Sequence, residues 1–342
     1  MIGSSVAVAL RRAGWWVTGS DLDTRRAQRA VELGVVDALG RDDGASLAVL
    51  ATPVGTIVPL ARARLARPGG TIVTDVGSVK REIVANIDDA RFVGGHPMAG
   101  SEQEGPDGAD ANLFAGATWV LTPTARTDEA AYATVRGVVA ELGAEVVALP
   151  PERHDEIVAV VSHVPHLSAA TLMALAADAA IEHGALLRLA AGGFRDMTRI
   201  AAGDSAIWPD IFDNNRGAVL ATLDAFIDRL RAARRMVAEG DRDALVALLE
   251  RARRARRNLP AHSTVPETLA ECRVPVPDRP GVLAEVTTLL GELGVNIVDL
   301  EIAHSTEGDA GVLVVSIDAT EVDKVRVALT ERGYRPGISQ LP

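Results

Sequence analysis

Residues 70–80 read Gly-Thr-Ile-Val-Thr-Asp-Val-Gly-Ser-Val-Lys, an apolar run that ends in a short polar loop. The run predicts a buried strand over Thr71–Asp75, because strands covered on both faces are apolar throughout. Similar runs alternate with helical patterns such as Asp23–Leu33 and Asp128–Leu142. They lie at Trp15–Gly19, Leu47–Ala51, Arg91–Gly94, Thr118–Leu121 and Glu145–Ala148. This alternation predicts an α/β domain with a doubly wound parallel sheet over residues 1–150.

The rest of the chain divides into a helical part and a mixed tail. Residues 151–257 lack strand-like runs and predict an all-helical domain. Its helices are expected over Glu152–His183, Ala185–Arg188, Ala206–Glu239 and Asp241–Arg257. Residues 258–269 hold two prolines and no periodicity, so we interpret them as a linker. Residues 270–342 follow the order strand, helix, strand, strand, helix, strand, which is typical of a ferredoxin-like domain.

Composition and charge argue against several classes of protein. A chain of 342 residues suggests two or three domains, at roughly 100–200 residues each. The net charge of −11 argues against a nucleic-acid or anionic-membrane binder, because phosphate surfaces require excess positive charge. A single cysteine, Cys272, rules out a disulfide framework and a cysteine-rich metal site. No apolar run reaches about 18 residues and no signal-peptide layout is present, so we expect a cytoplasmic protein without a membrane span.

The first residues match part of the Rossmann dinucleotide-binding pattern. That pattern needs a strand, Gly-x-Gly-x-x-Gly, a helix, a second strand and an acid about 20 residues further on. Gly3 fits the third glycine and Asp21 fits the acid that binds ribose hydroxyls, although both also suit plain turns. The first strand and the first two glycines are missing from the sequence. Because a sheet without that strand leaves backbone groups unpaired, we expect a coding sequence that starts upstream of Met1, or a truncated chain.

Two segments at the ends of predicted strands carry candidate catalytic side chains. Ser78 follows the strand at Thr71–Asp75, at the carboxyl edge where doubly wound sheets bind ligands. His96 follows the strand at Arg91–Gly94, between Gly-Gly and Pro, which predicts a tight loop. A histidine in such a loop suits acid–base chemistry near neutral pH. A helix cap or a surface loop remains the alternative for each segment.

A polar cluster is expected within the first long helix of the helical part. Ser162 and His166 are four residues apart and share a helix face, with a kink expected at Pro165. His163 and His166 suggest a metal site at first sight. No third ligand follows at a suitable spacing, so we expect no metal.

A second cluster lies at residues 192–201, Gly-Gly-Phe-Arg-Asp-Met-Thr-Arg-Ile-Ala, and is followed by Trp208. Arg195 and Arg199 stand beside glycines and an aromatic residue. Because a guanidinium binds a carboxylate through two hydrogen bonds, the segment predicts a carboxylate clamp. An ordinary ion pair is the alternative.

Taken together, these segments resemble the prephenate/arogenate dehydrogenases of tyrosine biosynthesis. The resemblance covers residues 1–257. It rests on Asp-Val-Gly-Ser-Val-Lys at 75–80, Gly-Gly-His-Pro-Met-Ala-Gly-Ser-Glu at 94–102, Val-Ser-His-Val-Pro-His at 161–166, and Gly-Gly-Phe-Arg-Asp-Met-Thr-Arg at 192–199. It implies NAD-dependent oxidative decarboxylation of prephenate to 4-hydroxyphenylpyruvate.

The same resemblance implies roles for individual residues. His96 would accept the proton or hydrogen bond of the ring hydroxyl, and Ser78 would orient that hydroxyl and the nicotinamide. The implied substrate contacts are Arg199, Arg195, His166, Ser162, Ser101, Glu102 and Trp208. The implied NAD contacts are Ile2, Gly3, Asp21, Thr52, Pro53 and Ser78. The acid at position 21 favours NAD over NADP, because a carboxylate repels a 2′-phosphate.

The tail resembles an ACT domain, a module that commonly binds amino acids between copies. The resemblance rests on the turn Asp-Arg-Pro-Gly-Val-Leu at 278–283 before the first helix. It implies a regulatory site at Asp278, Gly281, Val282 and Leu283, with tyrosine or another aromatic amino acid as ligand. Independently, the helical part is rich in Ala and Leu beyond what one sheet domain can cover, which predicts a two-fold homodimer.

Three other functions stay open. An arogenate dehydrogenase would act on a substrate that differs by one keto-to-amine change. A related hydroxy-acid dehydrogenase also pairs a dinucleotide domain with a helical domain. A non-enzymatic amino-acid sensor would use the ACT domain, with its cofactor site disabled by the missing strand.

Overall fold

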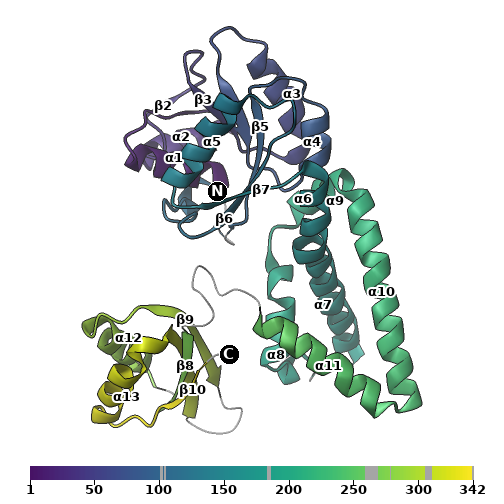
Figure 1. Ribbon diagram of the computed structural model, residues 1–342, viewed down its shortest axis with the longest axis vertical. Coiled ribbons are helices and arrows are strands. Elements are labelled where there is room, and N and C mark those ends of the chain that lie inside the picture. Colours follow the sequence, from purple (N-terminus) through teal and green to yellow (C-terminus); the bar gives the residue numbers. More distant parts are fainter. Residues whose placement is uncertain are drawn as a thin grey trace. The chain divides into compact units, whose positions relative to one another are not determined.

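The chain folds into two compact units, Met1–Arg231 and Ala232–Pro342. The computed structural model describes residues 1–100, 103, 105–182, 186–258, 269–277, 279–304 and 310–340. The boundary between the units falls within helix α10 (Arg216–Glu239). The first unit therefore combines the expected sheet domain with most of the expected helical part (Figure 1).

The first unit is built on a five-stranded sheet in the order β3-β4-β5-β6-β7. Its strands are β3 (Leu47–Leu50), β4 (Ile72–Asp75), β5 (Phe92–Pro97), β6 (Thr118–Thr122) and β7 (Glu145–Ala148). All five were predicted, but the sheet is mixed, because β5 and β6 are antiparallel. A parallel pair needs a long crossover, usually a helix. The described residues between β5 and β6 form only one 3-10 turn, Pro106–Gly108, so the prediction of a wholly parallel sheet is wrong here.

Two short strands form a separate parallel pair ahead of this sheet. They are β1 (Thr18–Gly19), shorter than the predicted Trp15–Gly19, and β2 (Ala38–Leu39), which was not predicted. Helix α1 (Ile2–Arg12) precedes β1, and α2 (Thr24–Glu32) connects β1 to β2. The Asp23 carboxylate caps α2 by accepting a hydrogen bond from the backbone N–H of Arg25, 2.9 Å away.

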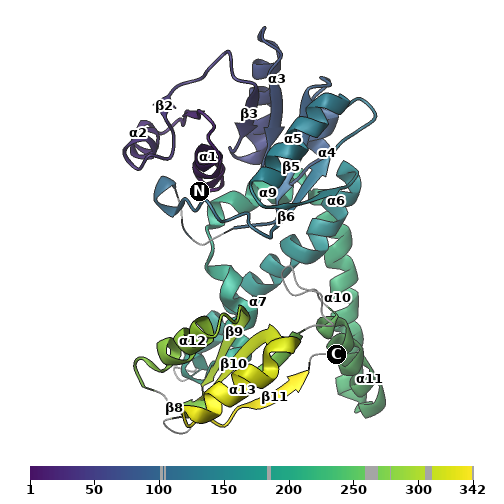
Figure 2. The same cartoon turned by 60° about the vertical axis from the view of Figure 1, so that its left-hand side comes forward.

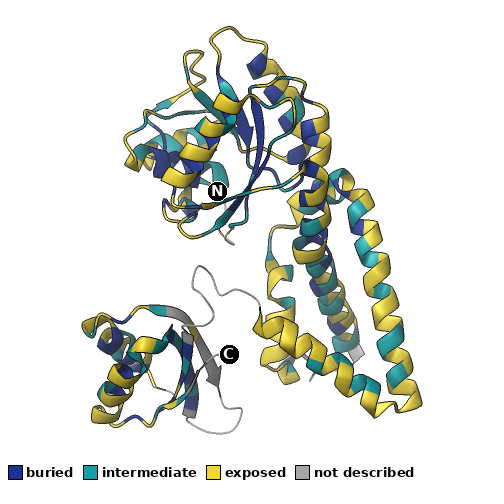
Figure 3. Cartoon of the chain, in the orientation of Figure 1, coloured by how far each residue is buried: buried dark blue, intermediate teal, exposed yellow. Residues whose placement is uncertain are grey.

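Helices cover both faces of the five-stranded sheet, as the doubly wound prediction required. The helices are α3 (Val54–Leu65), α4 (Arg81–Ala85) and α5 (Glu129–Glu141), together with α1. Neighbouring residues of β5 point into different cores. Phe92 packs with α3 and α4, whereas Val93 packs with α1 and α5. Figure 3 shows the buried strands between these helices.

The helical part begins with α6 (Pro151–Val158), a π-helical turn (Ala159–His163) and α7 (Val164–Glu182). The π turn ends just before Pro165, whose missing N–H leaves the carbonyl four residues earlier without its helical partner. An 18-residue window within residues 151–181 reaches a mean hydropathy of 1.5 and is 28% buried. By length and composition alone this helix is long and apolar enough to cross a membrane, a property that the core helices of non-membrane proteins share.

The following helices are shorter than expected. They are a 3-10 turn (Leu186–Leu189), α8 (Gly192–Thr198), α9 (Trp208–Asn214) and α10. The single helix predicted over Ala206–Glu239 is broken at Asn215, whose side chain is committed to two buried hydrogen bonds.

The second unit contains the C-terminal third of α10, helix α11 (Arg242–Arg257) and a four-stranded antiparallel sheet. The sheet elements are β8 (Leu269–Pro277), α12 (Val282–Glu292), β9 (Ile297–His304), β10 (Ala310–Asp318), α13 (Val322–Glu331) and β11 (Gly337–Gln340). The strand order β11-β8-β10-β9 confirms the ferredoxin-like prediction (Figure 2). Apolar residues of both helices pack on one side of this sheet. Residues 259–268 of the expected linker lie outside the described residues.

Close packing around β5 makes Gly95 a test of this fold. A Cβ atom there would lie 2.7 Å from the Asp75 carbonyl oxygen, a backbone atom that cannot swing away. We expect Gly95→Ala to lower the free energy of unfolding by about 1–3 kcal/mol. All four tryptophans lie in the first unit, so urea unfolding followed by tryptophan fluorescence measures the effect.

The matched control is Gly137→Ala within α5, where a Cβ would meet nothing within 4 Å. Alanine stabilises a helix relative to glycine by about 1 kcal/mol, so this variant should be neutral or more stable. Equal effects of the two substitutions would contradict the packing argument.

Candidate active site

His96 lies within a strand and not in the tight loop that the sequence predicted. β5 continues to Pro97, and His96 stands opposite Val120 of the antiparallel strand β6. The backbone N–H of Met98 still donates to the Thr118 carbonyl, 2.8 Å away. Since β6 provides backbone partners this far along, the half-buried His96 is fixed by the sheet.

A chain of hydrogen bonds leads inward from His96 to two residues that sequence reasoning missed. His96 Nδ1 lies 2.8 Å from His154 Nε2, and His154 Nδ1 lies 2.7 Å from Asp155 Oδ1. His154 and Asp155 lie on α6 and are almost fully buried. Their only sequence signal is an adjacent histidine and aspartate near the start of the helix predicted from Glu152, where such a pair suggests an ordinary polar face.

Asp155 also joins the helical part to the sheet. Its Oδ1 accepts a hydrogen bond from Lys80 N at 2.7 Å, and its Oδ2 accepts one from Arg81 N at 2.9 Å. These amides begin α4, so a carboxylate from α6 caps α4. The Asn215 amide donates to the Asp155 backbone carbonyl at 2.9 Å and lies 3.1 Å from His163 Nδ1.

A fully buried ion pair lies at the end of β4. Lys80 Nζ contacts the carboxylate of Asp75, and neither side chain is exposed. The backbone N–H groups of Gly77 and Gly95 also donate to Asp75, at 2.9 and 3.1 Å. Burial lowers the pKa of Lys80, and the charge of Asp75 opposes that shift. The pair ties the loop that carries Ser78 to the strand that carries His96.

The surroundings of His96 favour its neutral form. Burial is the largest cause that lowers the pKa of His96 well below 6.5, followed by the nearby His154, Lys80 and His163. Burial also lowers the pKa of His163 to about 4. Both imidazoles are therefore neutral at pH 7, and the neutral form is the one that accepts a proton.

His166 stacks on Trp208, which comes from a different helix. Their ring centroids lie 3.6 Å apart and the planes differ by 14°. His163 meets the same indole edge-on at 6.2 Å. Burial lowers the pKa of His166, so its ring is also held toward the neutral form. Ser162 lies in the π-helical turn, where the α-helical spacing behind its predicted shared face with His166 does not apply.

The predicted carboxylate clamp remains a prediction. Arg195 on α8 and Arg199 in the following 3-10 turn are both exposed. Arg195 Nε donates to the Ala190 carbonyl at 3.2 Å. Ser101 and Glu102, the other predicted substrate contacts, lie outside the described residues.

The residues predicted to hold the dinucleotide lie at or close to the ends of α1, β1, β3 and β4. A Cβ on Gly3 would lie 2.6 Å from the Cβ of Ala51, so only glycine permits this close approach of α1. No side chain caps α1 and no acid lies in its first turn, which leaves a helix start suited to an anion. Thr52 and Pro53 are exposed directly before α3, and Asp21 is exposed after β1. Ser78 is half-buried between β4 and α4.

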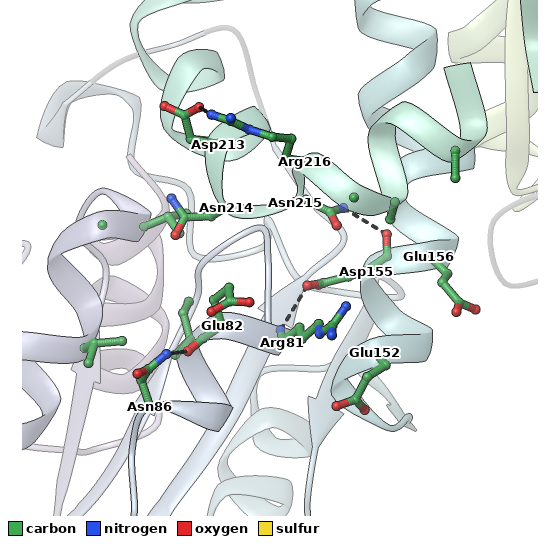
Figure 4. A pocket seen from close by; sticks show the side chains of 17 residues that line it. Arg81, Glu82, Asn86, Glu152, Asp155, Glu156, Asp213, Asn214, Asn215 and Arg216 are labelled. Atoms are coloured by element: carbon green, nitrogen blue, oxygen red, sulfur yellow. Dashed lines mark hydrogen bonds and ion pairs between the residues drawn. The ribbon is translucent and has the colours of Figure 1, made fainter. Parts of the chain in front are cut away.

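A pocket of about 740 Å³ lies on another side of this network. Its walls come from α3, α4, α6, α9 and the start of α10. Figure 4 shows that Arg81, Asn215 and the carboxylate of Asp155 meet at its wall, with Glu82 and Glu152 around them. None of the predicted site residues within the described part of the chain lines this pocket.

The sequence matches three protein-family models in order. They are the prephenate dehydrogenase nucleotide-binding domain over residues 6–148, the prephenate dehydrogenase dimerization domain over 150–251, and the ACT domain over 271–332. The chain is 34% identical to a prephenate dehydrogenase of Bacillus subtilis, over 94% of this chain and 91% of that protein. It is also 34% identical to a cyclohexadienyl dehydrogenase of Zymomonas mobilis, over 75% of this chain and 92% of that protein.

Solved structures agree. The crystal structure of prephenate dehydrogenase from A. aeolicus with hydroxyphenyl propionate and NAD+ superposes with a TM-score of 0.71 and 32% identity, covering 75% of this chain and 93% of that one. Synechocystis arogenate dehydrogenase gives a TM-score of 0.65 and 33% identity, covering 75% and 95%.

Neutral His163 makes the first unit sensitive to acid. Its pKa is near 4 in the fold and near 6.5 in an unfolded chain, so its contribution to stability is complete above pH 6.5 and is lost as the pH falls toward 4. We expect this loss to amount to about 3 kcal/mol. Urea unfolding followed by tryptophan fluorescence should show His163→Gln less stable than the parent at pH 7, with a gap that shrinks by this amount at pH 4. A gap that stays constant with pH would contradict the assignment.

Proposed function

Because the chain belongs to the prephenate dehydrogenase family, we propose that it catalyses the NAD-dependent oxidative decarboxylation of prephenate to 4-hydroxyphenylpyruvate. The observation that carries the proposal is His96, a neutral imidazole held by the sheet and joined to buried partners. Bound NAD+ supplies a hydride acceptor. The half-buried start of α1, with Ile2 and Gly3, would hold its pyrophosphate, and Asp21 would bind the ribose.

His96 and Ser78 act on the ring hydroxyl. His96 accepts the hydroxyl proton, or a strong hydrogen bond from it, while hydride leaves the same carbon. Loss of the ring carboxylate as CO2 supplies the electron pair that makes the ring aromatic. The proton held by His96 then returns to the phenol oxygen, so no net proton is consumed. Ser78, which follows β4, orients the hydroxyl and the nicotinamide.

The arginines and the stacked pair recognise the two carboxylates and the ring. Arg199 and Arg195 stand on an exposed surface, where an anionic substrate can reach their guanidinium groups. The stack of His166 on Trp208 presents a flat surface that suits a six-membered ring. Ser162, Ser101 and Glu102 complete the proposed set. Assays with prephenate and with arogenate, each with NAD+ and with NADP+, decide the substrate and the cofactor.

His96 provides the sharpest test of this function. We expect His96→Asn to keep the apparent substrate constant within several-fold and to lower turnover by about 10²–10⁴, the usual contribution of a general base. Because the pKa of His96 is lowered, the acid limb of kcat/KM in the parent enzyme should lie below pH 6.5. NADH formation followed by absorbance measures both quantities. Turnover of the variant within a few-fold of the parent would exclude His96 as the proton acceptor.

The helical part is proposed to form a homodimer. Apolar side chains stand exposed on it within the first unit, among them Val160, Val161, Leu175, Ile181 and Leu220. A second copy of the chain that covers these side chains would also bury the apolar helix over residues 151–181. No membrane is then required to explain its apolar surface.

Light scattering should give the mass of two chains at micromolar concentration. Leu175→Glu should shift the protein toward the monomer, because it places a charge in the proposed interface. Leu22→Glu, at a fully exposed leucine of the sheet domain, is the matched control and should leave the dimer intact. A monomeric parent protein would contradict the proposal.

The ACT domain is proposed to bind an aromatic amino acid as a feedback signal. Gly281 has a φ of +91° and caps α12, which begins at Val282. The Val282 amide donates to the Arg279 carbonyl at 3.4 Å, so the ligand carboxylate would meet the next amide of this helix start, that of Leu283. Asp278, the first residue of the predicted regulatory set, lies outside the described residues. Cytoplasmic location and the lack of nucleic-acid partners remain predictions from composition and charge.

Removal of the tail tests this regulation. We expect tyrosine to bind the intact protein in calorimetry and to lower its activity. Deletion of the chain from residue 262 should leave catalysis intact and abolish the inhibition, because a ligand acts at a distance only when it prefers one conformational state. Equal inhibition of the shortened and intact enzymes would place the tyrosine effect at the active site.

A further inference from the structure

We infer that His154 and Asp155 are positioning residues that hold His96 with its proton on Nδ1, which leaves the lone pair of Nε2 to take the proton of the substrate. The inference deepens the proposed function, on which it rests for the identity of the substrate. Its evidence is the chain of contacts from the sheet to α6.

Asp155 determines which atom donates in each hydrogen bond between Asp155, His154 and His96. Each oxygen of this carboxylate already accepts a backbone N–H, from Lys80 at 2.7 Å and from Arg81 at 2.9 Å. Because both oxygens of this side chain accept from backbone donors, the carboxylate acts here as an acceptor only. The 2.7 Å contact with His154 is therefore a hydrogen bond that His154 Nδ1–H donates.

The donor assigned at Asp155 also fixes the tautomers of His154 and His96. A neutral His154 with its proton on Nδ1 has a lone pair on Nε2, and that lone pair faces His96 Nδ1 at 2.8 Å. His96 must then donate from Nδ1, so its own lone pair is on Nε2. The opposite assignment needs a cationic His154 in a fully buried position beside other cationic or basic groups, which desolvation disfavours.

The other groups around His96 agree with this assignment. Lys80 is a cation whose charge acts on His96, and Asp75 matches that charge in a buried pair. His163 Nδ1 lies 3.1 Å from the amide nitrogen of Asn215, which can only donate, so His163 accepts there and is neutral. The same Asn215 amide donates to the Asp155 carbonyl and fixes α6 beneath the rings. The assigned His96 tautomer therefore requires no further cation beside the ring. None of these groups competes for the hydrogen on His96 Nδ1.

The chain also supports the proton transfer itself. When the ring hydroxyl gives its proton to His96 Nε2, the O–H bond breaks, an N–H bond forms and the imidazole gains one positive charge. His154 Nε2 still accepts from Nδ1–H of this imidazolium, and Asp155 holds His154 through the other ring nitrogen. The hydrogen-bonded carboxylate at the end of the chain opposes the new charge. The proton returns to the phenol oxygen after CO2 leaves.

Nitrogen NMR tests the tautomer without any substrate. In protein labelled with 15N-histidine, the two ring nitrogens of a neutral imidazole have different shifts according to which one carries hydrogen. Loss of signals in His96→Asn assigns the His96 ring. We expect its Nδ1 to be protonated at pH 7.5 and its Nε2 to be unprotonated. The reverse pattern in the parent protein would overturn the inference.

Substitutions at His154 test whether the His96 tautomer controls kcat. His154→Leu removes the acceptor, so Nε2–H should appear on His96 and kcat should fall by about 10- to 100-fold with a smaller change in KM. His154→Gln keeps an acceptor oxygen and should recover most of this loss. An unchanged His96 tautomer in His154→Leu, or equal kcat values for the leucine and glutamine variants, would overturn the inference.

Asp155→Asn has a matched control in Asp210→Asn. Both carboxylates come from the helical part and cap a helix of the sheet domain, Asp210 through Gly55 N at 2.9 Å, but only Asp155 touches His154. Asp155→Asn should mix the His96 tautomers, and Asp210→Asn should leave the tautomer unchanged. The same tautomer in both variants would reduce Asp155 to a helix cap and overturn its part of the inference. Inactivity of the parent on prephenate would contradict the proposed function alone, since the NMR results need no turnover.

Discussion

The carboxylate of Asp155 is the interaction on which the rest of the first unit depends. It is buried and meets three donors, the amides of Lys80 and Arg81 and the ring of His154. A buried carboxylate is tolerated only when hydrogen bonds replace its water. These donors come from two separate parts of the chain, so satisfying one charge also docks α6 against the start of α4. That docking brings the helical part to the sheet at His96.

The buried pair of Lys80 and Asp75 performs a complementary task. Removing both charges from water is costly, and the pair tolerates burial because Asp75 also accepts hydrogen bonds from the backbone of Gly77 and Gly95. The result is a rigid connection between β4, its loop and β5. Burial is the main cause that lowers the pKa of His96, and the nearby charge of Lys80 adds to it, so this imidazole stays neutral and able to accept a proton. The buried pair therefore both fixes β5 against β4 and contributes to the neutral state of His96.

The helix that starts at α6 has two different environments. Its buried side carries His154 and His163, which meet the sheet domain and α9. Its other side exposes Val160 and Val161 within the π-helical turn. α7 is apolar on nearly every side, and the proposed dimer would bury the side that the first unit leaves exposed. The site and the proposed dimer are thus consequences of the same sequence, because the side chains that position the chemistry and those that need a partner alternate along one helix.

The sequence pattern over a few neighbouring residues was enough to predict elements that local interactions determine. The strand over Glu145–Ala148 has the predicted bounds, and the ferredoxin-like order of the tail was readable, because alternation and turn residues act over a few positions. Tertiary structure alone decided the antiparallel pairing that places His96 in a strand, and the contact with His154, 58 residues later. Contacts between distant residues leave no periodicity in one sequence. Buried histidines and aspartates acquire their roles only from the partners that folding brings within hydrogen-bond reach.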